Sequence, residues 1–280
     1  MAKDFRTVIE PIKSAFRLNH ETKMTLIGSC FTDNIGSRLV DDGFDACVNP
    51  LGILFNPASI ANIVKRALDD EYFKISDLQC VNGVYHCLDL ESRRQSTDAE
   101  RLLAELNEAL RDFAVVLRHS DIWFVTFGTA WVFEYRETSR IVGNCHKLAA
   151  DKFDRRRLSI EEIVEAWKPL CEDRQVVFTV SPVRHLADGL HGNTLSKSTL
   201  LLAIDMLVSE TTATYFPAYE IVNDDLRDYR FYDADMKHPS PVACDYIYDK
   251  FAHTYFDKTT MALAENNRRL ARLSKHRPIL

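Results

Sequence analysis

The stretch Met24-Thr25-Leu26-Ile27-Gly28-Ser29-Cys30-Phe31 decides the fold, because it changes from a strand pattern to a helix pattern at a single glycine. A short apolar run ends at Gly28, and apolar side chains then recur at the helical spacing of Phe31, Ile35 and Leu39. A strand, a tight turn and a helix are therefore expected in direct succession. A serine at such a turn can project its hydroxyl from the carboxyl end of a sheet, which is where doubly wound sheets bind ligands.

The rest of the chain alternates between short apolar runs and longer helical patterns, which indicates α/β layering. Further strands are predicted at residues 44–48, 122–127, 176–180 and 219–222, a hairpin at 131–135 and 140–142, and a strand or irregular segment at 84–90. Helices are predicted at 57–68, from an N-cap at Thr97 to Leu117, from an N-cap at Ser159 to Trp167, at 195–208, and from Pro241 onward. We expect residues 1–260 to form one α/β domain with a small hairpin insertion, and residues 261–280 to form a solvated basic tail.

The composition is that of an ordinary globular chain and argues against several classes of protein. The 280 residues carry 35 Lys and Arg against 41 Asp and Glu, and a net charge of −6 is unlike the basic footprint of a nucleic-acid binder. No apolar run approaches the roughly 20 residues of a membrane-spanning helix, and the first residues contain no apolar core of a signal peptide. The seven cysteines are scattered without a CxxC pair, so neither a disulfide framework nor a zinc ribbon is expected. These features predict a cytoplasmic protein with no nucleic-acid or membrane partner.

A candidate base for Ser29 lies far along the chain, in Asp235-Met236-Lys237-His238. A serine hydroxyl is a weak nucleophile at neutral pH and needs a base, and that base needs a group to hold its tautomer. The chain order Ser29, Asp235, His238 therefore predicts a nucleophile, an orienting carboxylate and a general base. The alternative is that Ser29 only caps the helix, which is a common role for serine. Cys30 is expected to point into the interface between sheet and helix as a small apolar residue.

Further blocks accompany Gly28-Ser29-Cys30-Phe31-Thr32. They are Phe127-Gly128-Thr129-Ala130-Trp131, Asn144-Cys145-His146-Lys147, Ser181-Pro182-Val183-Arg184-His185 and the segment from Asp235 to Ser240. Taken together, these blocks resemble the GSCFA-domain proteins of the SGNH/GDSL esterase and acyltransferase superfamily. The resemblance extends from about residue 20 to 255. The blocks together are specific for the family, whereas any one of them alone would not be.

The resemblance implies a three-layer α/β/α sandwich with a mainly parallel five-stranded sheet, similar to SGNH hydrolases. It also implies a catalytic triad in which Ser29 is the nucleophile and Asp235 and His238 complete the set, with no cofactor. The implied activity is hydrolysis of an ester, in a small molecule or an O-acylated glycan. Two alternatives stay open: an O-acyltransferase with the same triad, and a binding module that kept the fold and lost catalysis.

The oxyanion hole departs from the superfamily pattern. Superfamily members combine the N–H of the nucleophile with a Gly after the second strand, for which Gly52, or alternatively Gly43, is the candidate. They also use an Asn after the third strand, where this chain has Ala130. We expect Asn144 to replace that donor, with the backbone at Gly128–Thr129 as the second choice. Losing one such donor typically costs on the order of 10²–10³ in rate, so the missing Asn favours the binding-module alternative.

Candidate substrate-binding residues lie in two of the same blocks. His146 and Lys147 are candidates for contact with an anionic substrate, or alternatively form a hairpin end with a partly buried His. Arg184 and His185 follow a predicted strand, and Arg184 is expected to bind a carboxylate or phosphate or, alternatively, to pair with an acidic residue. His185 and His191 lack a further ligand of clear spacing, so no metal site is predicted.

Overall fold

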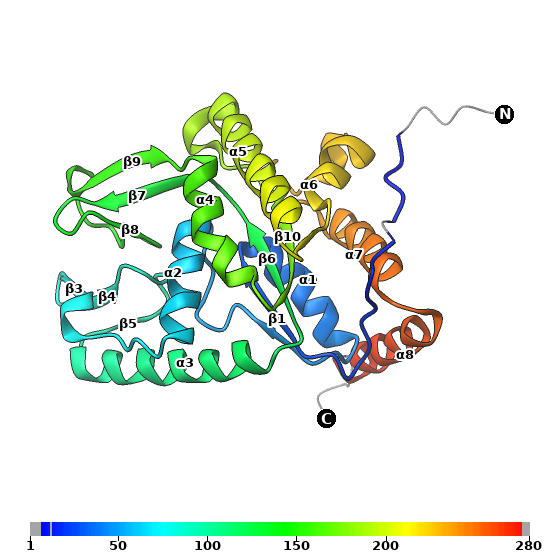
Figure 1. Ribbon diagram of the computed structural model, residues 1–280, viewed down its shortest axis with the longest axis horizontal. Coiled ribbons are helices and arrows are strands. Elements are labelled where there is room, and N and C mark those ends of the chain that lie inside the picture. The colour runs from blue at the N-terminus through cyan, green and yellow to red at the C-terminus, as the bar shows by residue number, and fades with distance from the viewer. Residues whose placement is uncertain (1–6, 12, 276–280) are drawn as a thin grey trace.

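A five-stranded parallel sheet forms the centre of the molecule, and the computed structural model describes residues 7–11 and 13–275 around it (Figure 1). The strand order is β11-β10-β6-β1-β2, and each neighbouring pair is parallel. The strands are β1 Met24–Gly28, β2 Ala46–Val48, β6 Ile122–Phe127, β10 Gln175–Val180 and β11 Thr214–Tyr215. The predicted strand, turn and helix around Gly28 are confirmed.

Both faces of this sheet are apolar, because the side chains of a strand point alternately to its two sides. In β6, Trp123, Val125 and Phe127 belong to one core, and Ile122 and Phe124 belong to the other. A sheet that is apolar on both faces has to be covered on both, so a layer of helices lies on each side (Figure 1). The expected three-layer α/β/α sandwich is confirmed.

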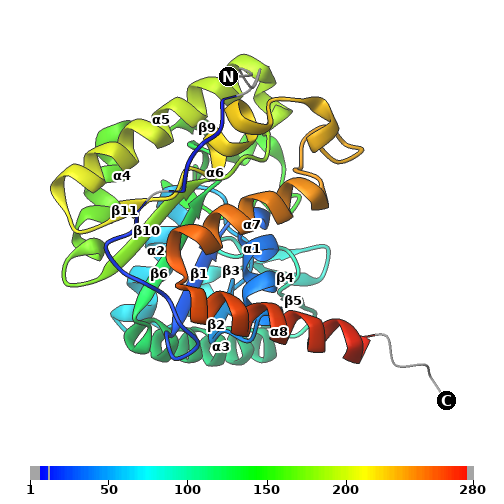
Figure 2. The same ribbon diagram turned by 90° about the vertical axis from the view of Figure 1, so that its right-hand side faces the viewer.

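Figures 1 and 2 show the two helical layers. One layer contains α2 Pro57–Leu68, α3 Ala99–His119, α4 Ile160–Trp167 and α5 Gly189–Glu210. The other contains α1 Cys30–Asp41, the short α6 Ala218–Glu220, α7 Pro241–Tyr255 and α8 Lys258–Lys275. Because the strands are parallel, the segments that follow β1, β6 and β10 all emerge at the same edge of the sheet, which is where a site is expected.

Helices α3 and α4 begin at residues whose side chains cap the helix N-terminus. The capping box predicted at Ser159 and Glu162 is present at the start of α4. The predicted N-cap of α3 is wrong by one residue: Asp98, not Thr97, accepts the Arg101 N–H, at 3.0 Å. Aspartate is a stronger N-cap than threonine, so the helix begins at the later position.

Two small antiparallel sheets lie beside α2 and α3 (Figure 1). The first consists of β3 Leu78–Val81, β4 Val84–Cys87 and β5 Gln95–Ser96, and the second of β7 Trp131–Tyr135, β8 Arg140–Val142 and β9 Phe153–Arg157. The second sheet contains the predicted hairpin. Its third strand, β9, was missed because three consecutive arginines conceal the alternation of a strand.

One expected element, the strand at 219–222, is wrong because packing overrode a local pattern. Residues 219–220 belong to α6, and residues 221–222 begin a π-helical segment at Ile221–Leu226. The fifth strand is instead β11, whose two residues are too few to produce a recognisable period. The helix expected at 195–208 begins earlier, at Gly189, because its first turns carry polar rather than apolar residues.

The segment 261–280, expected as a solvated tail, is helical as far as Lys275. Arg268 in α8 pairs with the buried carboxylate of Asp42 at 2.6 Å, which fastens this helix to the end of α1. The last five residues, 276–280, lie outside the described part of the chain.

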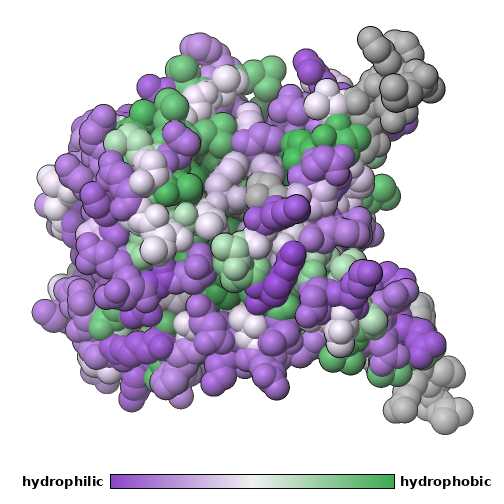
Figure 3. All heavy atoms as spheres, turned by 45° about the vertical axis from the view of Figure 1, so that its right-hand side comes forward, coloured by the Kyte–Doolittle hydropathy of each residue, from purple (hydrophilic) through white to green (hydrophobic). Residues whose placement is uncertain are grey.

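The face seen in Figure 3 is mostly hydrophilic, with apolar patches scattered across it. Single exposed apolar residues are normal on a globular protein. In the part of the chain that the structure describes, no helix combines the length and apolarity needed to cross a membrane.

Candidate active site

Ser29 occupies the turn between β1 and α1. It is the N-cap of α1, its Oγ accepts the Phe31 N–H at 3.3 Å, and it is 0% exposed. Gly28 makes this turn possible, because its φ is +143° and a Cβ there would lie 2.2 Å from the Thr126 carbonyl oxygen. Ser29 therefore caps α1, whatever further role it has. A hydroxyl that accepts a hydrogen bond still carries its own proton, so capping leaves Ser29 able to donate to a base.

Asp235 and His238 form a hydrogen-bonded pair in the loop before α7. His238 Nδ1 lies 2.6 Å from Asp235 Oδ2, and Asp235 Oδ1 accepts the backbone N–H groups of Lys237 and His238 at 2.9 and 3.0 Å. The His238 N–H, followed by the His238 side chain, holds the pKa of Asp235 well below its usual range. The carboxylate is thus ionised and fixed, which is the condition for it to orient an imidazole.

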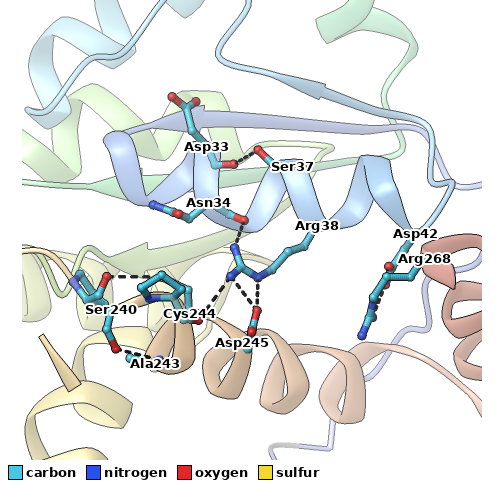
Figure 4. Close-up of polar contacts among 12 residues, drawn as sticks. Asp33, Asn34, Ser37, Arg38, Asp42, Ser240, Ala243, Cys244, Asp245 and Arg268 are labelled. Carbon is cyan, nitrogen blue, oxygen red and sulfur yellow. Dashed lines mark hydrogen bonds and ion pairs between the residues drawn. The ribbon is translucent and has the colours of Figure 1, made fainter. Parts of the chain in front are cut away.

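Helices α1 and α7 carry Ser29 and the His238 loop toward the same edge of the molecule. The two helices run side by side in the same direction, and Arg38 of α1 donates to Asp245 of α7 from Nε and Nη2, at 2.9 and 2.7 Å (Figure 4). Ser29 directly precedes α1, and His238 lies two residues before Ser240, the N-cap of α7. The parallel packing therefore places both helix starts, and the residues before them, at one end.

The predicted hydrogen bond between Ser29 and His238 is not made in this structure, as far as residues 7–11 and 13–275 are concerned. Ser29 is enclosed, whereas the side chains of Asp235 and His238 are 44% and 45% exposed. Catalytic hydrogen bonds are often long or unformed without a ligand. The contact therefore stays a prediction for a substrate-bound state.

A buried lysine joins the ends of two central strands at this edge. Lys197 of α5 is 1% exposed, and its Nζ donates to the carbonyl oxygens of Gly128 and Ser181 at 2.6 and 2.7 Å. Those two residues directly follow β6 and β10. Burial lowers the pKa of Lys197 to about 7. The bridge holds the two strand ends at a fixed separation.

Sequence reasoning missed Lys197, although the pattern contained a signal for it. Lys197 falls in register with Leu200 and Ile204, three and seven residues later, and both of those side chains are buried in the core. A lysine in the apolar stripe of a helix has to be buried with its charge satisfied or removed. A buried polar contact at this position could have been predicted.

Two more buried polar residues of α5 hold the same edge of the sheet. Ser196 Oγ accepts the Ala130 N–H at 2.7 Å, and Asn193 Oδ1 accepts the His185 N–H at 3.0 Å. The segment after β6 and the segment after β10 are therefore both tied to one helix. Neither contact was predicted, because Ala130 and Ser196 are 66 residues apart and Asn193 lies before the expected start of α5 at residue 195.

His185 lies at the predicted edge with one ring nitrogen free. Its Nε2 is buried with no partner among the described residues, and a Cβ on Gly128 would lie 3.3 Å from it. The edge of its ring meets Phe55, with the ring centroids 5.5 Å apart. Burial, with smaller contributions from Lys197 and His238, lowers its pKa to about 4. His185 is therefore neutral near pH 7 and has a nitrogen available to a ligand.

The backbone N–H groups expected in the oxyanion hole are largely occupied. The Gly52 N–H donates to the Asn49 carbonyl at 2.8 Å, and the Gly128 N–H donates to the Phe55 carbonyl at 2.7 Å. The first bond closes a turn and the second holds the end of β6. The Ser29 N–H makes only a long bond, of 3.4 Å, to a carbonyl of β6. Of these three donors, the one on Ser29 is the most easily released.

The two other candidates for an oxyanion donor lie elsewhere. Gly43 follows the carboxyl end of α1 and precedes β2, so it belongs to the opposite edge of the sheet. The Asn144 N–H donates to the Leu88 carbonyl at 3.0 Å, and its Oδ1 accepts the His146 N–H at 2.8 Å. Asn144 is thus a structural residue at the junction of the two small sheets, because its polar groups bind backbone there.

His146 is not placed for substrate contact, and the hairpin-end alternative is correct. The ring is buried, and Nε2 lies 2.8 and 3.0 Å from the carbonyl oxygens of Cys87 and Leu90. It packs against the ring of His86, with centroids 4.8 Å apart. Burial lowers its pKa, so it is a neutral link between the small sheets. Lys147 is exposed beside it.

Arg184 lies next to the His238 loop, where a substrate residue was expected. Its backbone N–H donates to the Lys237 carbonyl at 3.2 Å. Its guanidinium carbon lies 4.0 Å from the ring centroid of Tyr232 and 5.1 Å from that of Tyr229. The alternative, an ion pair with an acidic residue, is not found among the described residues.

Cys30 packs partly buried against the core on the α1 side of the sheet, as predicted. Burial, and then the charge of Asp33, raises the pKa of its thiol, so it is a poor nucleophile. The described residues contain no group of three His, Cys, Asp or Glu side chains that could hold a metal ion.

Comparison with known proteins adds one finding. The sequence matches the GSCFA family over residues 23–251, which includes the strand ends, α5 and the His238 loop. No curated protein and no solved structure matches the chain.

Proposed function

This chain belongs to the GSCFA family, and from the arrangement of Ser29, Asp235 and His238 we propose that it is a serine-dependent ester hydrolase related to the SGNH superfamily. The observation that carries the proposal is the short Asp235–His238 hydrogen bond, in a loop that α7 brings to the same edge as Ser29. A serine at a strand–helix turn and an oriented imidazole are the two parts that acyl transfer needs.

In the proposed reaction, Ser29 Oγ attacks the ester carbonyl while His238 Nε2 takes the serine proton. Asp235 holds the proton on Nδ1, because its Oδ2 lies 2.6 Å away, and this leaves Nε2 free as the base. His238 then returns the proton to the departing alcohol as the C–O bond breaks. Water then attacks the acyl-enzyme carbonyl while His238 takes a proton from the water. His238 returns this proton to Ser29 Oγ as the acid leaves, which restores the enzyme.

Substrate binding has to open the turn around Ser29. The segment after β2 lies over it: Gly28 donates its N–H to Asn49 Oδ1 at 2.8 Å and accepts the Leu54 N–H at 3.1 Å. We propose that this segment shifts when an ester enters, which frees the Ser29 N–H for the oxyanion. The α1 N-terminus adds a favourable dipole at that point.

We propose a small-molecule or glycan ester as substrate and the cytoplasm as the location. An acyltransferase would use the same three residues with an alcohol in place of water. The binding-module alternative is favoured by the enclosure of Ser29 and by the occupied N–H groups of Gly52 and Gly128. Activity measurements separate these alternatives.

The deciding experiment compares wild type with Ser29→Ala on a series of p-nitrophenyl acyl esters. We expect the serine variant to lose about 10³-fold or more in kcat. Ser37→Ala is the matched control, because Ser37 lies two turns further along α1 and its hydroxyl donates to the Asp33 carbonyl of the same helix. Equal hydrolysis by wild type and Ser29→Ala would rule out the serine mechanism, as would a fluorophosphonate label on another residue.

A further inference from the structure

A hollow of about 210 Å³ lies next to the His238 loop and has no role in the mechanism above. It is formed between Arg184 and the chain that follows α6. Its lining residues are Arg184, Val222, Asn223, Arg227, Asp228, Tyr229 and Tyr232. A space of this size accommodates one small charged group rather than a whole glycan.

Arg184 is held in this hollow by aromatic rings instead of by an acid. Its guanidinium carbon lies 4.0 Å from the Tyr232 centroid, and the Tyr229 ring lies on the same cation at 5.1 Å. Stacking engages the face of the Arg184 guanidinium, and a side-chain hydrogen bond with Tyr232 uses part of its N–H edge. The remaining N–H groups can meet a planar anion. Neither Arg184 nor Arg227 has a carboxylate at ion-pair distance within the described residues, so both cations are available.

The one acidic side chain in the lining is already occupied. Asp228 Oδ1 accepts the Arg230 N–H at 2.9 Å, and its Oδ2 lies 3.8 Å from Arg230 Nε. Two arginines against one neutralised carboxylate leave the hollow with net positive charge. Such a site attracts an anion.

The hollow is coupled directly to the proposed base. The Arg184 N–H donates to the carbonyl of Lys237, the residue before His238. On the other side, Tyr232 pairs with Pro239, the residue after His238. The hollow and the loop that carries His238 are therefore joined through the residues on either side of His238.

We propose that this hollow binds an anionic oxygen group of the substrate, a carboxylate or a phosphate, with Arg184 as the main contact and Arg227 as the second. The inference rests on the proposed ester hydrolysis, and it makes the preferred substrate an ester that carries negative charge close to the bond that breaks. Arg184 is then a specificity-determining residue, and the tyrosines keep its guanidinium in place before the substrate arrives.

The test compares a neutral ester, p-nitrophenyl butyrate, with a charged ester of similar size, mono-p-nitrophenyl succinate. We expect wild type to prefer the charged ester by about 10- to 100-fold in kcat/KM, the usual range for a hydrogen-bonded charge pair. Arg184→Met should remove that preference, mainly by raising the KM for the charged ester. Arg174→Met is the matched control. The Arg174 guanidinium also stacks on an aromatic ring, 4.7 Å from the centroid of Trp123, but it does not line the hollow.

Binding measured without turnover separates this inference from the proposed function. Ser29→Ala is titrated with succinate and with inorganic phosphate by calorimetry, and the same titrations are repeated with Arg184→Met and Arg227→Met added. Anion binding that is lost in the arginine variants supports the hollow even if no ester is hydrolysed, and the tighter of the two anions identifies the group. Hydrolysis without charge preference, together with no anion binding, would overturn the inference while leaving the esterase intact. Circular dichroism checks that each variant is folded, and Arg227→Met replaces Arg184→Met if the latter is not.

Discussion

At the scale of single residues, backbone conformation and hydrogen bonding decide where the candidate nucleophile and base lie. Ser29 can follow β1 so abruptly only because Gly28 adopts a conformation that other residues rarely reach. The imidazole of His238 is oriented because Asp235 accepts hydrogen bonds from its ring and from its backbone N–H at once. The Gly28 turn and the Asp235–His238 hydrogen bonds each involve neighbouring residues, so each can be tested by one substitution.

Gly28→Ala is expected to destabilise the protein by about 3 kcal/mol or more, since the new Cβ would meet the Thr126 carbonyl oxygen at 2.2 Å in a strained backbone. Urea denaturation measures the free energy of unfolding. Gly83→Ala is the control, because Gly83 also has a positive φ but no atom within 4 Å of the added Cβ. Similar losses in both variants would show that backbone strain alone, and not the contact at Gly28, sets the cost.

Asp235→Asn is expected to lower kcat for p-nitrophenyl esters by about 10³- to 10⁴-fold with little change in KM, because the amide would favour the wrong tautomer of His238. Asp249→Asn serves as control, since Asp249 lies on the exposed side of α7. Steady-state kinetics on both variants is the measurement. An unchanged kcat in Asp235→Asn would remove Asp235 from the mechanism.

At the scale of elements, the packing of α1 against α7 aligns the segments that carry the candidate nucleophile and the candidate base. Arg38 donates to Asp245 and also to the Asn34 carbonyl of its own helix at 2.9 Å, which fixes its direction (Figure 4). The contact lies about two turns from the start of α1 and about one turn from the start of α7. It therefore sets how the helices slide relative to each other, and with them Ser29 and His238.

Arg38→Ala is expected to cost only about 1 kcal/mol of stability, because Asp245 is 71% exposed and exposed ion pairs are weak. We expect a larger effect on kcat, a loss of about 10-fold or more, since small misplacements of reacting groups are costly. Arg101→Ala, which breaks an exposed pair within α3, is the control for stability. A normal kcat in Arg38→Ala would show that this contact does not govern the alignment.

At the scale of the whole molecule, the sheet edge is built from segments that only the three-layer fold brings together. Lys197 reaches from α5 to the ends of β6 and β10 and is shielded from water by both. The folded state therefore contains an amine whose charged form is disfavoured. This links the stability of the entire fold to pH.

The folded pKa of Lys197, about 7, lies below the roughly 10.4 of an unfolded lysine. Between these values the unfolded chain holds more protons, so the Lys197 contribution to the free energy of unfolding is full above about 10.4 and is lost as the pH falls toward 7. We expect the stability difference between wild type and Lys197→Met to increase with pH across that window. Denaturation at several pH values measures it, with Lys168→Met, an exposed ion-pair variant, as control. Parallel curves for wild type and Lys197→Met would contradict the shifted pKa.

Much of the fold could be predicted because the decisive patterns are local. The buried strands at 122–127 and 176–180 and the capping box at Ser159 and Glu162 depend only on neighbours in the chain. The two-residue β11 could not be predicted in this way, because two residues are too few to show strand alternation. Its hydrogen-bonded pairing with β10 makes it a strand. The same holds for α8, which Arg268 fastens to Asp42.

The strand–turn–helix at Gly28, the three-residue spacing that lets Asp235 hold His238, and the apolar runs that require a covered sheet can all be predicted from short-range geometry. The enclosure of Ser29, the Lys197 bridge between two strand ends, and the backbone contacts of Asn144 and His146 follow from tertiary packing. Those outcomes depend on segments that lie far away in the chain. A polar side chain at such a place binds whichever partner the packing of the layers brings within reach.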